Sequence, residues 1–162
     1  MSGDHKRIGE ILIEKGLITE AQLHDALMEQ QVNSKFLGAI LVSKNLITND
    51  DLIESLASQF GIPLVDIKSH YVDMELARKF SSSLILDHKC FPLIEDESSV
   101  TVAIINPLDA LAISKIEEAC MPREVKLVLV KEEDMKNVLA SFRLYINKSI
   151  QQMLKKDKKP NE

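Results

Sequence analysis

The sequence predicts an α+β protein in which a duplicated helical subdomain precedes a small sheet-and-helix subdomain. Residues 7–30 align without gaps on residues 36–59, and both segments have the apolar period of amphipathic helices. Beyond them, short apolar runs alternate with helical stretches, which is typical of a sheet covered by helices. We therefore expect a helical subdomain over residues 1–61, a sheet-and-helix subdomain over 62–150 and a polar tail over 151–162.

The two copies of the repeat are offset by 29 residues, and ten of their 24 aligned positions are identical. Chance rarely gives that agreement at an ordinary composition. Two copies are too few for an open solenoid, so we expect them to pack on one another in a two-fold-like arrangement. The identical pairs are Gly9/Gly38, Ile11/Ile40, Leu12/Leu41, Lys15/Lys44, Leu17/Leu46, Ile18/Ile47, Thr19/Thr48, Leu23/Leu52, Leu27/Leu56 and Gln30/Gln59.

Each copy predicts a short helix, a tight turn and a longer helix. Gly16 ends the first short helix by taking the left-handed conformation, and Asn45 does so in the second copy. Thr19 and Thr48 are the expected N-caps of the longer helices, and Gly61 ends the second of them. The leucines at helical spacing are expected mainly in the core: Leu12, Leu23, Leu27, Leu41, Leu52 and Leu56.

The remainder of the chain alternates between strand and helix signals. An acidic and serine-rich turn at residues 95–99 joins two β-branched runs and predicts a hairpin. The expected elements are a short strand over 64–67, helices over 74–80 and 83–89, strands over 91–94 and 100–105, a helix over 108–119, a strand over 125–130 and a long helix over 132–154.

The charge and hydropathy of the chain exclude several classes of partner. Lys and Arg number 20 against 25 Asp and Glu, which gives a net charge of −5 and no overall basic field for DNA or RNA. No apolar run approaches the roughly 20 residues that span a bilayer. The first residues are polar where a signal peptide carries an apolar region. We therefore expect a cytoplasmic protein without direct membrane insertion.

Residues for catalysis or metal binding are not evident. Cys90 and Cys120 lack the CxxC spacing of redox and zinc sites, so we expect free, packed thiols. The phosphate loop GxxxxGK[ST], HExxH, GxSxG and the Gly-rich dinucleotide fingerprint are all missing, which predicts a non-enzymatic protein with no catalytic residue. Ligand spacing for a metal is also missing among the histidines, which are His5, His24, His70 and His88.

The repeat also carries a double motif. Its first copy consists of Arg7, Ile8, Gly9, Leu12, Ile13, Gly16, Leu17, Ile18, Leu23, Leu27 and Gln30, and its second of Phe36, Leu37, Gly38, Leu41, Val42, Asn45, Leu46, Ile47, Leu52, Leu56 and Gln59. This motif resembles the N-terminal domain of type II secretion and type IV pilus assembly ATPases, including the cyclic di-GMP-binding MshEN class. The resemblance spans residues 7–146, and we expect this domain without the ATPase domain of that family.

The resemblance implies cyclic di-GMP as ligand, with no other cofactor. An arginine can donate two hydrogen bonds to a guanine edge, glycine permits close backbone approach, and glutamine can bond base edges or phosphates. One expected half-site contains Arg7, Gly9 and Gln30, and the other contains Leu37, Gly38 and Gln59, with Phe36 in the place of the arginine. The full set of candidate ligand-binding residues is Arg7, Ile8, Gly9, Leu12, Gln30, Phe36, Leu37, Gly38, Leu41 and Gln59.

Two departures from the family pattern leave an alternative open. Phe36 stands where the family has arginine, and Asn45 where it has glycine. Loss of a charged hydrogen bond costs about 1.5–3 kcal/mol, although phenylalanine can still stack on a base. The alternative is a protein–protein docking adaptor for the inner-membrane platform or the motor ATPase, without a nucleotide ligand. In that case Gly9 and Gly38 serve close helix packing.

Overall fold

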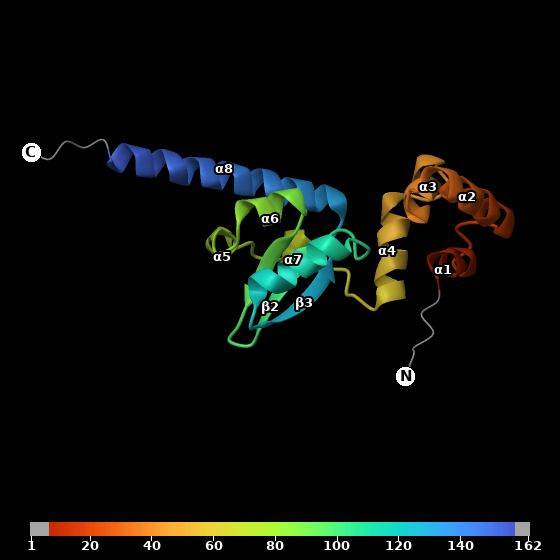
Figure 1. The fold of residues 1–162 in the computed structure, drawn as a ribbon, viewed down its shortest axis with the longest axis horizontal. Coiled ribbons are helices and arrows are strands. Elements are labelled where there is room, and N and C mark those ends of the chain that lie inside the picture. The colour runs from red at the N-terminus through yellow and green to blue at the C-terminus, as the bar shows by residue number, and fades with distance from the viewer. Residues whose placement is uncertain (1–6, 158–162) are drawn as a thin grey trace, which may run out of the picture. The chain divides into compact units, whose positions relative to one another are not determined.

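A computed structural model describes residues 7–157, so that His5 lies outside the described residues. The chain divides into two compact units, the first ending at Leu64 and the second beginning at Val65 (Figure 1). We call the first the helical unit and the second the sheet unit. The expected α+β fold is confirmed, because the helical unit contains helices only and the sheet unit combines helices with a three-stranded sheet.

The helical unit consists of two helical hairpins in sequence. Its helices are α1 (Ile8–Glu14), α2 (Glu20–Asn33), α3 (Leu37–Ser43) and α4 (Asn49–Phe60). The predicted turns are confirmed, since Gly16 and Asn45 have φ of 71° and 56°. The predicted caps are confirmed as well: the Thr19 hydroxyl accepts a hydrogen bond from the backbone of Gln22, and the Thr48 hydroxyl does so from Asp51.

The hairpins pack in a two-fold-like pattern. Helix α1 lies against α4, and α2 lies against α3. If the two repeats are exchanged, the contact of α1 with α4 becomes the contact of α3 with α2, so the two contacts are equivalent. The buried core includes two equivalent pairs, Leu12/Leu41 and Ile18/Ile47, together with Ala26 and Ile40. The duplication therefore encodes one core rather than two.

Burial does not follow the repeat everywhere. Leu56 on α4 is buried, but the equivalent Leu27 on α2 is 40% exposed, so the expectation that Leu27 is a core residue is wrong. Leu23 and Leu52 are only partly buried and pack on the rim of the core. Sequence identity at two repeat positions fixes the residue type but not the neighbours, which differ between α2 and α4.

A further difference between the two copies, Ala26 in one and Ser55 in the other, predicts a stabilising substitution. Ala26 and Ser55 occupy equivalent, fully buried positions, and the Ser55 hydroxyl has no hydrogen-bond partner. A buried unpaired hydroxyl costs about 1–3 kcal/mol. Ser55→Ala is therefore expected to raise the free energy of unfolding by about 1 kcal/mol in urea titrations. The reverse change in the other copy, Ala26→Ser, should destabilise the protein; stabilisation by that change would contradict the interpretation.

The sheet unit contains five helices and three strands among the described residues. They are a 3-10 helix η1 (Ile67–Ser69), α5 (Met74–Arg78), α6 (Ser82–Asp87), β1 (Phe91–Glu95), β2 (Ser99–Ile104), α7 (Ala110–Cys120), β3 (Glu124–Leu129) and α8 (Glu132–Lys156). The expected strand over 64–67 is wrong. Val65 donates one backbone hydrogen bond to Leu129, and the Asp66 carboxylate then accepts from the Lys68 backbone and starts η1.

The sheet has the order β1-β2-β3, with β1 antiparallel and β3 parallel to β2. Because side chains alternate along a strand, Val102 and Ala103 point to opposite faces. The Ala103 face belongs to the main core with Phe91 and with Leu139 and Phe142 of α8. Helix α7 lies against β3, and Figure 1 shows it in front of the sheet. Helices α5, α6 and α8 therefore build the main core on one face, while α7 covers the other.

Helix α8 confirms the long helix expected over 132–154 and ends two residues later, at Lys156. The first part of the expected polar tail, residues 151–156, is therefore helical. This segment contains Met153, Leu154 and good helix formers without glycine or proline. Residues 158–162 lie outside the described part of the chain. Figure 1 shows that the last turns of α8 run past α5 and α6.

Two cysteines and one acidic turn have distinctive electrostatics. Cys90 and Cys120 are free and buried, as expected, and burial raises the pKa of Cys90 to about 12.

Hydrogen bonds from Lys79 and Arg123 lower the pKa of Glu95. Hydrogen bonds donated by the side chain and backbone of neighbouring serines lower the pKa of Asp96. These carboxylates stay charged and hold the turn between β1 and β2.

Within residues 7–157, no helix is both long and apolar enough to cross a bilayer. The same residues contain no group of three His, Cys, Asp or Glu side chains placed to hold a metal ion.

Candidate functional site

Arg7 and Phe36 occupy equivalent places at the starts of α1 and α3. Both are N-cap residues with extended backbone, and both are exposed, Phe36 to 57%. The Arg7 backbone N–H donates to the Glu10 carboxylate at 3.2 Å. Its guanidinium has no carboxylate partner among the described residues. Each short helix therefore presents a large exposed side chain at its start, an arginine in one copy and an aromatic ring in the other.

Gln30 lies beside the start of α3. Its Nε2 donates to the backbone oxygen of Lys35 at 2.9 Å, next to Phe36. Gln30 thus lies beside Phe36 of the second copy. The expected grouping of Arg7 with Gln30 stays a prediction.

Helix α1 packs on α4, which carries the half-buried Gln59. The pKa of Asp51, at the start of α4, is lowered mainly by hydrogen bonds from Thr48, with a smaller contribution from the charge of Lys15. The expected half-sites therefore share two exposed residues at equivalent helix starts, Arg7 and Phe36, with Gln30 beside Phe36.

Gly9 and Gly38 are buried and permit close helix packing. A Cβ atom on Gly9 would lie 2.7 Å from a methyl carbon of Leu23, and one on Gly38 would lie still closer to Leu52. Each glycine therefore lets the short helix of a hairpin approach the long helix of the same hairpin. This favours the packing role for both glycines over direct contact with a ligand.

Leu12 and Leu41 are fully buried in the core of the helical unit, so neither can contact a ligand without unfolding part of it. Ile8 and Leu37 are half-buried on the rim of that core. Leu27, which the sequence places in the core, is exposed one turn before Gln30 on α2 and is therefore a further candidate for ligand contact. The available signal was that spacing, which puts both side chains on one face of the helix.

Basic groups near these half-sites differ in their availability. Lys44 forms an ion pair with Glu29 at 2.8 Å, and this contact raises the pKa of Lys44. Lys35 has no carboxylate partner among the described residues and precedes Phe36 directly. Arg7 and Lys35 are thus the cations that remain available to an anion at the starts of the short helices.

Residues 60–145 match the model of the MshEN domain, which is more than half of the chain. The chain belongs to the MshEN domain family. The match falls mainly on the sheet unit of this MshEN chain and includes only the last residue of α4 from the duplicated helices. The resemblance expected over residues 7–146 is therefore confirmed over its later part.

Two curated relatives of the MshEN chain are type IV pilus assembly ATPases. It is 29% identical to the type IV pilus assembly ATPase PilB of Thermus thermophilus over 115 residues, which are 70% of this chain and 13% of that protein. It is also 29% identical to PilB of Myxococcus xanthus over 117 residues, 72% of this chain and 20% of that protein. The chain thus spans at most a fifth of the length of these relatives.

Solved structures reproduce the fold across both units. A structure of MshE with cdg has a TM-score of 0.77 at 23% identity and covers 85% of this chain and 99% of that one. The N-terminal domain of XpsE has a TM-score of 0.66 at 22% identity and covers 83% of this chain and 92% of that one. These likenesses extend the fold relationship to the helical unit.

Proposed function

We propose that this MshEN chain is a non-enzymatic regulatory module of type IV pilus or type II secretion machinery, and that its helical unit binds cyclic di-GMP. The observation that carries the proposal is the equivalent placement of Arg7 and Phe36 at the starts of two short helices, and we infer that Gln59 completes the half-site of Arg7 and Gln30 that of Phe36. A ligand with two identical guanine nucleotides suits two sites related by a two-fold-like exchange. The fold likeness to MshE with cdg, an abbreviation of cyclic di-GMP, supports the same assignment.

Each half-site offers a distinct chemistry to one guanine. The Arg7 guanidinium can donate in parallel to O6 and N7, and the Phe36 ring can stack on the other base. Gln30 and Gln59 supply amide donors and acceptors. The exposed Leu27 adds apolar cover for a purine face. Binding regulates the module only if the ligand prefers one packing of the helices over another.

Replacement of Phe36 by arginine is expected to strengthen cyclic di-GMP binding by about 10- to 150-fold, because it restores a charged hydrogen-bond donor worth about 1.5–3 kcal/mol. Arg7→Ala should weaken binding by a similar factor. Isothermal titration calorimetry measures both. Arg78→Ala, which removes an arginine of the sheet unit, is the matched control and should leave the affinity unchanged.

The same titrations contain the result that contradicts the proposal. Heat with Phe36→Arg but none with the wild type would identify a ligand site that has decayed in this chain. Absence of heat in the wild type and in every variant would remove cyclic di-GMP as ligand.

The second candidate function is docking without a nucleotide. The sheet unit carries most of the family match, and two relatives of the chain are type IV pilus assembly ATPases. This favours a role for the sheet unit in contacts with the motor ATPase or the inner-membrane platform, on the cytoplasmic side. Co-purification with a tagged motor ATPase or platform protein of the same cell tests it, and recovery of neither would count against docking.

A further inference from the structure

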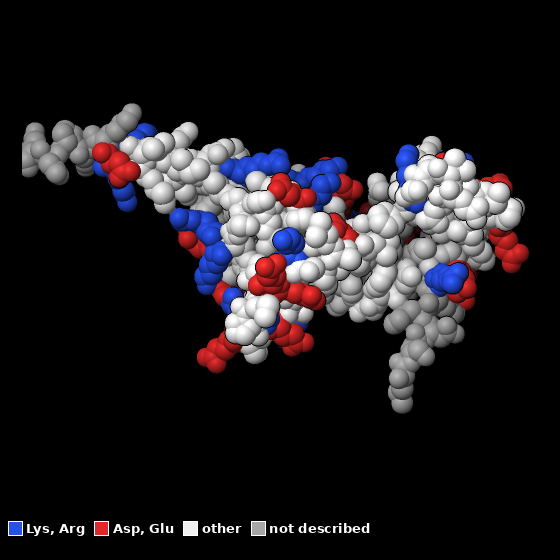
Figure 2. Space-filling model, in the orientation of Figure 1, with Lys and Arg blue, Asp and Glu red and all other residues white. Residues whose placement is uncertain are grey.

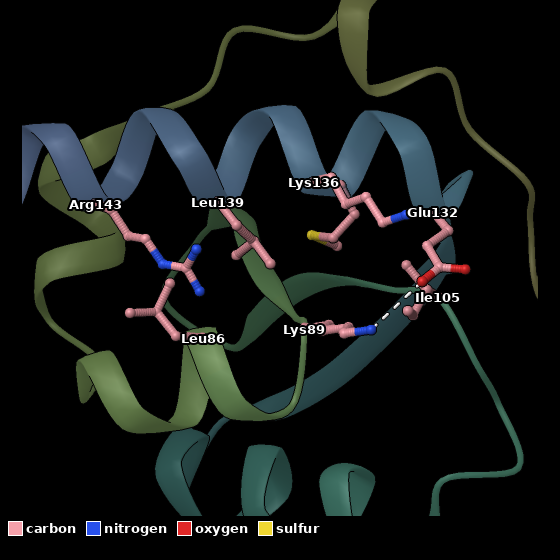
Figure 3. A pocket seen from close by; sticks show the side chains of 8 residues that line it. Leu86, Lys89, Ile105, Glu132, Lys136, Leu139 and Arg143 are labelled. Atoms are coloured by element: carbon pink, nitrogen blue, oxygen red, sulfur yellow. Dashed lines mark hydrogen bonds and ion pairs between the residues drawn. The ribbon is translucent and has the colours of Figure 1, made fainter.

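We propose that a pocket between α6 and α8 binds an acidic amphipathic helix of a partner protein. This α6–α8 pocket has a volume of about 170 Å³ (Figure 3). Its floor is apolar, and its rim carries three cations and one carboxylate, so that the rim is positive on balance. The residues that line it are Leu86, Lys89, Ile105, Glu132, Met135, Lys136, Leu139 and Arg143. The inference rests on the docking role proposed above and is independent of cyclic di-GMP binding.

The rim of the pocket carries unpaired positive charge. Lys89 forms an ion pair with Glu132 at 3.4 Å, whereas Lys136 and Arg143 have no carboxylate partner within residues 7–157. Helix α8 has no acidic residue between Met135 and Lys156, although the chain as a whole has a net charge of −5. Figure 2 shows basic side chains over the part of α8 that crosses α6. Such a local field favours an acidic partner.

The floor of the pocket is accessible only to a side chain of the partner that inserts between α6 and α8. Met135 and Leu139 are buried and Leu86 is half-buried, so only an apolar group that enters between the helices can reach them. In Figure 3, Leu139 lies between Arg143 and Lys136 along α8. These two cations are two helical turns apart, or about 10.5 Å along the axis. The complementary segment has two acidic residues two turns apart with an apolar residue between them.

Helix α8 extends this surface beyond the pocket. Ile146, Ile150 and Leu154 follow Leu139 on the same side of α8. Ile150 and Leu154 are about half exposed. Figure 2 shows mostly uncharged atoms over this part of the helix. A partner helix that enters the pocket can therefore continue along α8 for further turns, with apolar contacts at each.

Other occupants fit this surface less well. Ligand pockets for drug-sized molecules usually enclose about 300–1,000 Å³, which exceeds the volume here. A flat lipid surface cannot reach a floor that lies below a basic rim. A symmetric dimer through the same surface would place Lys136 and Arg143 against their own copies, which like-charge repulsion opposes.

The test uses the whole chain and a labelled synthetic helix of about five turns with the acid–apolar–acid pattern, measured by fluorescence anisotropy. The wild type is expected to bind it in a salt-dependent manner. Lys136→Glu with Arg143→Glu should weaken binding by about tenfold or more. Lys115→Glu with Lys126→Glu makes the same change in net charge elsewhere in the sheet unit and should leave binding unchanged. Circular dichroism establishes that both double variants are folded.

A charge exchange makes the outcome decisive. The same peptide with lysine in place of its acidic residues should bind the Lys136→Glu/Arg143→Glu variant and not the wild type. Failure of the acidic peptide to bind, or equal losses of affinity in the two double variants, would overturn the proposal. It would also be overturned if phosphatidylglycerol vesicles outcompete the peptide, or if the wild type forms a dimer that only the Lys136→Glu/Arg143→Glu variant abolishes. None of these results depends on calorimetry with cyclic di-GMP, so the two proposals fail separately.

Discussion

Replacement of Phe142 by alanine is expected to lower the free energy of unfolding by about 3–5 kcal/mol, which is the usual cost of deleting a buried aromatic ring. Phe142 is fully buried, and its ring meets that of Phe91 edge-on, with the centroids 5.8 Å apart. Both rings belong to the core between α8 and the sheet. The deletion removes this contact and leaves a cavity that the surrounding strands cannot close. Denaturant titration followed by far-UV circular dichroism measures the loss.

The matched control is Leu144→Ala, two residues further along α8. Leu144 is 67% exposed, so its truncation should change the free energy of unfolding by no more than about 0.5 kcal/mol. Similar losses for the two variants would show that α8 does not present Phe142 to the sheet as described.

Leu12→Ala and Leu41→Ala are each expected to cost about 2–5 kcal/mol. The two leucines are fully buried at equivalent positions of the repeat, and they share one core. The two losses should therefore be similar, which is a direct consequence of the two-fold-like packing. Leu27→Ala is the control on the same unit and should cost clearly less, because Leu27 is substantially exposed.

This pair of variants also separates core residues from ligand contacts. A leucine that serves the core lowers stability when truncated, while one that serves only a ligand lowers affinity without a comparable loss of stability. If Leu12→Ala and Leu41→Ala destabilise the protein only weakly but abolish cyclic di-GMP binding, both residues contact the ligand.

The local structure of the repeat is predictable from sequence because each signal acts within a few residues. A glycine or asparagine is needed where φ is positive, as at Gly16 and Asn45. A threonine with a polar residue three positions later closes a capping box, as at Thr19 and Thr48. The strand over 64–67 failed for the same local reason, since the Asp66 side chain competes for the backbone.

The half-sites are a different matter. Repeat alignment groups Arg7 with Gln30 because they lie in one copy, but the hydrogen bond from Gln30 to Lys35 places Gln30 beside Phe36. The sequence alone does not specify which faces of the two hairpins pack against each other. That choice is made by the packing of α1 on α4 and of α2 on α3.

The sequence by itself determined the helical duplication, its caps and turns, and the class of fold, since these follow from short-range hydrogen bonding and apolar period. Only the tertiary structure decided that Leu27 is exposed although the equivalent Leu56 is buried, and that unpaired cations of α8 surround an apolar pocket. The physical reason is that burial and charge pairing depend on neighbours distant in sequence. Such neighbours are defined only when the helices and strands pack.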